Sequence, residues 1–161
     1  MEDTGLETTT LNEALRFSFP DGFRKLSEAE MKQMKLVQSG PGVCLRDEDR
    51  HIIVSLGYRR AGLFDAILGG KDLVKSAQSR IAGVMRPYGY QLAGSASCPV
   101  GSKTGQYFQY TYTAQNTEMV GECCAIKEGK TIYYLHFYVR KTSRDEGFAL
   151  WREILQNARW L

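Results

Sequence analysis

Residues 106–114 have the sequence QYFQYTYTA, and residues 131–139 have the sequence TIYYLHFYV. In both stretches aromatic and β-branched residues recur with a period of two, which is typical of a β-strand. In the second stretch both alternating sets are mainly apolar or aromatic, so we expect it to lie at the centre of a sheet, covered on both faces. The turn at residues 128–130 predicts a hairpin that pairs this strand with residues 118–126.

The rest of the sequence predicts further helices and strands on both sides of this hairpin in the chain. Ser27 and Glu30 have the spacing of a capping box and predict the start of a helix. We expect residues 1–12 to form a flexible tail and residues 13–161 to form a single domain. The fold class is α+β, with a mostly antiparallel sheet of about six strands flanked by helices in the order β-α-β-β-α-β-β-β-β-α. The predicted strands are 15–19, 43–46, 51–58, 90–98, 106–114, 118–126 and 131–139. The predicted helices are 28–38, 71–86 and a last helix that is capped by Ser143 or Asp145 and runs to about residue 158.

Composition limits the classes of function. The chain has 161 residues, of which 43% are hydrophobic and 24% charged, with a net charge of +3. Its basic residues are scattered, which disfavours nucleic acid as a partner. No apolar stretch approaches the ~20 residues of a membrane-spanning helix, so no membrane role is expected. The acidic start at residues 1–4 is unlike a secretion signal, which leads us to expect a cytoplasmic location.

The cysteines and histidines do not have the spacing of a metal site. Cys123 and Cys124 are adjacent in a predicted strand and face opposite sides of it, so they cannot easily bridge each other. With Cys44, Cys98 and only two histidines, no set has the spacing of a zinc site. We expect four reduced, mostly buried thiols and no bound metal.

The sequence contains no complete catalytic or cofactor motif. A phosphate loop would need a glycine at residue 65 and a hydroxyl at residue 72, and both positions are aspartate, so no nucleotide cofactor is expected. A Cys–His nucleophile could be drawn from Cys44 with His51, or from Cys124 with His136. The expected register of the last hairpin separates the second pair, and neither pair has an orienting third group. We therefore expect no enzyme activity and no cofactor.

A partner-binding surface is the remaining candidate site. Between two basic residues and a Gly-Gly pair, four large apolar residues occur at helical spacing and would be costly to expose without a partner. The alternative is a short helical turn that covers the protein's own core. The tyrosines of the strands leave a similar choice between core packing and an uncovered aromatic face. The candidate partner-binding residues are Arg59, Arg60, Leu63, Phe64, Ile67 and Leu68.

The chain resembles the PsbP/Mog-like superfamily over about residues 13–161. The resemblance rests on the sequence FSFPDGF at residues 17–23, the long helix at 71–86, the hairpins at 107–127 and 130–140, and a closing helix that ends in Trp160. It implies an antiparallel sheet between helices and action by binding rather than by catalysis. Its bacterial branches of unknown function include DcrB-like proteins and proteins that resemble chaperones of type VI secretion effectors. The family has no invariant site that can be carried over to these positions.

We therefore expect a bacterial cytoplasmic protein-binding module of chaperone or adaptor type. Its partner would be another protein or an apolar helix or peptide, and a homodimer is compatible with these residues. The alternative is a small-molecule-binding domain that uses the same concave sheet surface. An exposed apolar groove would favour the first function, and a closed cavity with a few polar groups would favour the second.

Overall fold

A computed structural model describes residues 7–34, 42–63 and 70–161. Within these residues one large antiparallel sheet dominates, with the strand order β3-β4-β5-β9-β8-β7-β6. The aromatic strand β9 lies in the middle of the seven, as its two apolar faces predict. The strands are β3 (Arg24–Lys25), β4 (Gly42–Asp47), β5 (Ile52–Arg60), β6 (Gln91–Val100), β7 (Lys103–Ala114), β8 (Thr117–Glu128) and β9 (Thr131–Arg140).

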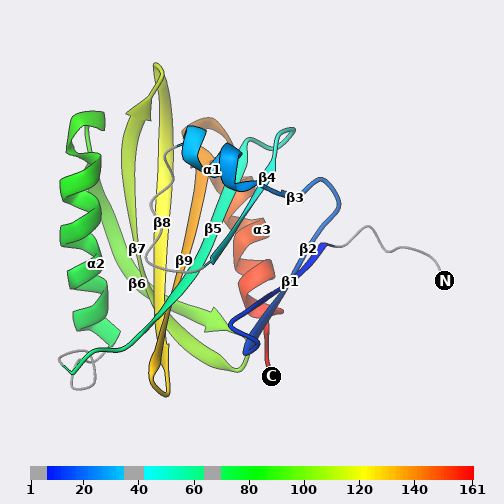
Figure 1. Cartoon of the computed structure of the whole chain (residues 1–161). Helices are drawn as coiled ribbons and strands as arrows, with labels where there is room; N and C mark the ends of the chain where they lie inside the picture. The colour runs from blue at the N-terminus through cyan, green and yellow to red at the C-terminus, as the bar shows by residue number, and fades with distance from the viewer. Residues whose placement is uncertain (1–6, 35–41, 64–69) are drawn as a thin grey trace.

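Two long helices lie on opposite sides of this sheet (Figure 1). Helix α2 (Gly70–Met85) packs on β7 and β8, and helix α3 (Arg144–Gln156) contacts β6 and β9. Short 3-10 segments at Arg86–Tyr88 and Lys141–Ser143 flank them. The predicted α+β class with a mostly antiparallel sheet and flanking helices is confirmed.

A second, three-stranded sheet was not expected from the sequence. It has the order β1-β2-β10, with β1 at Glu7–Leu11, β2 at Leu15–Phe19 and β10 at Arg159–Trp160. The prediction of a flexible tail over residues 1–12 is therefore wrong for residues 7–11, which pair with β2 along their whole length. The reason is local: three successive threonines favour an extended chain, and Thr9 and Leu11 are buried on the inner face.

Helix α1 (Glu28–Met34) begins with the predicted capping box. The Glu30 amide donates to Ser27 Oγ at 3.2 Å, and the Ser27 amide donates to Glu30 Oε1 at 3.1 Å. These two bonds satisfy backbone donors that a helix start otherwise leaves unpaired.

Each face of the large sheet has its own core. The α3 side contains Phe17, Leu135, Phe137 and Trp151, and the inner face of the small sheet contributes to it. The α2 side contains Leu73, Ile81, Phe108, Tyr110 and Tyr134. These cores cover the central strands on both faces, whereas residues 91–97 of the edge strand β6 are exposed.

Candidate functional site

The predicted contact residues lie where β5 leaves the sheet. Arg59 and Arg60 are the last residues of β5, and the side chain of Leu63 is 92% exposed three residues later. Among the described residues Leu63 is the most exposed large apolar side chain, and a partner that covered it would remove it from water. The other predicted residues, Phe64, Ile67 and Leu68, lie outside the described residues, as does the short helix expected there.

The β8–β9 hairpin lies beside this segment. Arg60 pairs with Thr131, and Thr131 pairs with Glu128 across the hairpin. The amide of Ala61 donates to the carbonyl of Lys130 at 2.7 Å, which continues the pairing one residue past β5. We call residues 59–63 and 127–131 together the basic sheet end.

A tyrosine fixes the first arginine of the basic sheet end. Arg59 Nη2 donates to the Tyr134 hydroxyl at 3.0 Å, and its guanidinium carbon lies 5.6 Å from the ring centre. Arg80 of α2 lies 5.1 Å from the centre of the same ring. Two guanidinium groups thus contact one buried aromatic ring, a favourable cation–π arrangement. Arg59 therefore joins β5 to β9, while Arg60 and Lys130 are exposed.

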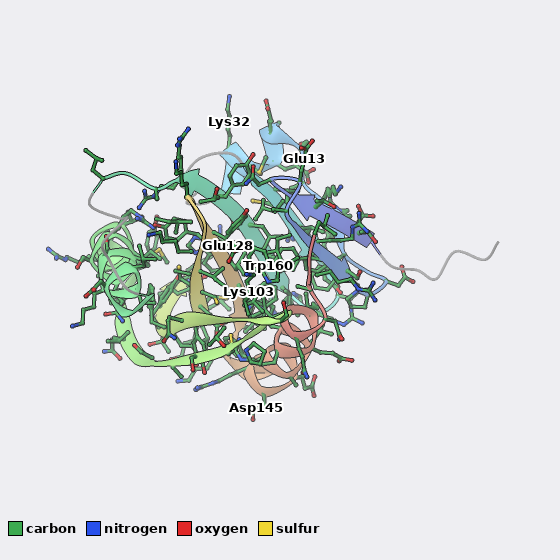
Figure 2. The ribbon with its side chains drawn as sticks, turned by 90° about the horizontal axis from the view of Figure 1, so that it is seen from below. Glu13, Lys32, Lys103, Glu128, Asp145 and Trp160 are labelled. Carbon is green, nitrogen blue, oxygen red and sulfur yellow. The ribbon has the colours of Figure 1, made fainter. Side chains whose placement is uncertain are left out.

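The charge of the basic sheet end is strongly positive. It contains four basic side chains and one acidic side chain, Glu128. The Glu128 carboxylate is bound by Lys103 of β7 at 2.7 Å, and the Lys103 ammonium lies 5.5 Å from the ring centre of Trp160. Figure 2 shows Glu128, Lys103 and Trp160 gathered in this region. The one carboxylate is therefore held toward the small sheet by a lysine outside the basic sheet end.

Sequence reasoning identified Arg59, Arg60 and Leu63 but missed Lys127 and Lys130. These two lysines join the basic sheet end through strand pairing, about seventy residues later in the chain. The signal in the sequence was the turn at residues 128–130. In the structure Gly129 has φ +61° and Glu128 pairs directly with Thr131, so Gly129 and Lys130 form a two-residue turn. A hairpin closed in this way places Lys130 at the tip.

The same tight turn corrects the expected register of the last hairpin. Cys124 lies opposite Leu135, and it is Cys123 that lies opposite His136. Cys44 lies opposite Ser55 rather than near His51, which is exposed in the turn. Neither Cys–His pair considered from the sequence is therefore in register. The cysteine and histidine that lie opposite each other are Cys123 and His136.

The electrostatics of this new pair do not favour nucleophilic chemistry. Burial raises the pKa of Cys123 to about 12 and lowers the pKa of His136 to about 4. At neutral pH the thiol is protonated and the imidazole is uncharged, whereas an activated cysteine needs thiolate character. All four cysteines are buried and free of disulfides, as expected. Within the described residues no group of three His, Cys, Asp or Glu side chains could hold a metal ion, and no helix is long and apolar enough to cross a membrane.

Comparison with known proteins gives likeness in structure only. No family model matches the chain, and no curated protein matches it. Cyanobacterial PsbP (CyanoP) from Synechocystis sp. PCC 6803 has a similar solution structure, with a TM-score of 0.69 and 10% identity over 100% of this chain and 95% of that chain. The Ran-binding protein Mog1p of Saccharomyces cerevisiae has a TM-score of 0.61 and 10% identity over 98% and 96% of the two chains. LpqN, involved in cell envelope biogenesis of Mycobacterium tuberculosis, has a TM-score of 0.58 and 12% identity over 96% and 91%.

The chain has the PsbP/Mog-like fold. Most of the tyrosines on the central strands pack into the two cores. Tyr110, Tyr133, Tyr134 and Tyr138 are all buried, and most of the tyrosine contacts are with other rings. Tyr107 and Tyr112 are half-buried, so the structure favours the core-packing alternative for most of the strand tyrosines.

Proposed function

We propose that the chain is a protein-binding module and that the basic sheet end is its contact surface. The observation that carries the proposal is Leu63, 92% exposed three residues after Arg60, whose strand pairs with the hairpin that contains Lys127 and Lys130. An exposed leucine at a basic end of the sheet combines an apolar anchor with a charged rim. That combination is typical of the centre and rim of protein interfaces.

The charge defines the partner's chemistry. A partner with carboxylates around an apolar pocket would cover Leu63 and face the four cations. Full burial of a leucine side chain contributes about 1.5–3 kcal/mol, which makes Leu63 the main source of affinity. The cations would chiefly speed association and set orientation, and their effect would weaken with salt.

Two considerations support a protein partner over a small ligand. Yeast Mog1p, which shares the fold, is a Ran-binding protein, so the fold can present a protein-binding surface. The alternative function needs a concave sheet surface, yet core side chains cover the central strands of the large sheet on both faces. We propose an adaptor or chaperone role without catalysis, in the cytoplasm.

The test is a capture experiment with matched variants. The immobilised protein is exposed to native lysate, and the bound proteins are identified by mass spectrometry. We expect a specific protein to be captured by the wild type and lost with Leu63→Asp and with Lys130→Glu. Because the cations act through solvent, capture should also fall as sodium chloride rises from about 0.05 to 0.3 M.

Val84→Asp is the matched control. Val84 is another exposed apolar residue, 47% exposed near the end of α2, and it lies outside the basic sheet end. It should capture the same partner as the wild type. If Leu63→Asp captures that partner as well as Val84→Asp does, the basic sheet end is not the contact surface.

A further inference from the structure

A surface groove of about 800 Å³ lies beside the small sheet, between the end of α3 and the turn that joins β6 to β7. The C-terminal strand β10 pairs with β2 at this place (Figure 1). Its lining is polar and rich in hydrogen-bond donors. The polar side chains that line it include Thr8, Arg16, Ser18, Ser102, Asn157 and Arg159.

Two arginines lie directly opposite each other in this groove. Arg16 of β2 pairs with Arg159 of β10 in the antiparallel register. Side chains at such positions have Cβ atoms about 5 Å apart, and like charges placed there repel each other. Within the described residues neither guanidinium forms an ion pair, so this repulsion is not offset by a carboxylate.

The fold holds both arginines on the outer face of the small sheet. Leu15, Phe17 and Phe19 of β2 are fully buried, so Arg16 and Ser18 between them face outward. Arg16 Nε donates to Thr10 Oγ1 at 3.5 Å, a long bond that still leaves its two Nη groups available. Ser18 pairs with Thr8 in the next row of the sheet, which places two hydroxyls beside the cations.

We propose that this groove binds a phosphate-bearing ligand between Arg16 and Arg159. Guanidinium groups match phosphate oxygens with paired N–H donors, and hydroxyl and amide groups complete such sites. A phosphate monoester carries close to two negative charges at neutral pH and so offsets both arginines, whereas a carboxylate carries one. The groove shares no lining residue with the basic sheet end, and this proposal does not depend on the proposed partner.

The test uses inorganic phosphate as the probe and thermal unfolding as the readout, on the whole chain. Phosphate at constant ionic strength should raise the Tm of the wild type, because a ligand that binds only the folded state stabilises it. Arg16→Thr and Arg159→Thr should each lose the phosphate-dependent rise. Without phosphate each of the two variants should melt at or above the wild-type temperature, because the repulsion is gone and threonine suits a strand.

Arg140→Thr is the matched control for charge and strand position. Arg140 is an exposed arginine at the end of β9, so its loss changes the net charge equally but leaves the groove intact. It should keep the full phosphate-dependent rise, and titration calorimetry of the wild type should show one phosphate per chain. The proposal is overturned if phosphate does not raise the wild-type Tm, or if Arg16→Thr and Arg159→Thr respond to phosphate as the control does.

Discussion

Arg152 of α3 and Glu122 of β8 form an ion pair inside the protein. Glu122 is completely buried, and Arg152 Nη1 donates to its Oε2 at 2.8 Å, while Nη2 contacts Oε1. Trp151 Nε1 donates to Oε2 at 2.8 Å, and Gln109 Nε2 donates to Oε1 at 3.0 Å. Burial alone would lower the pKa of Arg152, but the bonds and charge of Glu122 outweigh it and raise that pKa. Helix α3 is thereby fixed to the sheet by charge as well as by packing.

Arg152→Met should destabilise the protein by about 3–5 kcal/mol, because it leaves a buried carboxylate with no cation. Adding Glu122→Gln should recover most of the loss, since a neutral amide can still accept the Trp151 N–H. Urea unfolding measures both. Arg24→Met removes an exposed ion pair with Glu30 and serves as the control, with a much smaller expected effect. A loss below about 1 kcal/mol for Arg152→Met would show that the pair is not needed for stability.

Glu30 should titrate far below an ordinary glutamate. The side-chain bond from Arg24 and the backbone bond from Ser27 lower its pKa to about 2. NMR titration of the carboxyl carbon measures this value. In Arg24→Ala the pKa should rise toward the ordinary range, whereas Arg46→Ala, which removes a neighbouring cation without touching Glu30, should leave it unchanged. An ordinary pKa in the wild type would argue against the capping geometry in solution.

The fold could be predicted from the sequence wherever periodicity extends over several residues. The central place of β9 followed from two apolar faces, and the start of α1 followed from Ser27 and Glu30. By contrast, β3 and β10 are two residues long, which is too short for any period to show. They form because neighbouring strands offer unpaired backbone groups, a property of the assembled sheet rather than of their own residues.

The candidate site was only partly predictable for a related reason. Leu63 and Arg60 are neighbours in the chain and were found together, whereas Lys130 joins them only through the register of β5 with β9. The partner of Glu122 could not be predicted from the sequence either. A lone charge in an apolar strand gives no hint that its partner is Arg152, thirty residues away in a helix.

Gly121→Ala should destabilise the protein by about 1–3 kcal/mol through overpacking. Gly121 lies opposite Tyr110, and a Cβ at this position would lie 2.5 Å from the Tyr110 ring. Because the ring is buried against Phe108 and Tyr112, it cannot move aside easily. Gly94→Ala in β6 is the matched control, since a Cβ there meets nothing within 4 Å, and it should be neutral or slightly stabilising. Equal urea midpoints for the two variants would contradict this packing.

His136 should make the protein less stable in mild acid. Burial, with a smaller contribution from the charge of Arg80, lowers its pKa to about 4 from an ordinary value of 6.5. Cys123 and Ser55 flank it on the neighbouring strands and the Tyr138 ring is stacked beside it, so no carboxylate among these neighbours compensates an added proton. Between pH 6.5 and 4 the unfolded chain therefore binds a proton that the folded protein does not.

Since the unfolded state binds more protons in this window, the free energy of unfolding falls as the pH falls, by at most about 1.4 kcal/mol per pH unit from this one group. His136→Phe keeps an aromatic ring beside Tyr138 and removes the titration, so its stability should change less between pH 7 and 4.5 than that of the wild type. His51→Gln is the control, because His51 is exposed in a turn and should leave the wild-type dependence intact. Urea unfolding at the two pH values measures this difference. If His136→Phe loses as much stability in acid as the wild type does, protonation of His136 does not account for the loss.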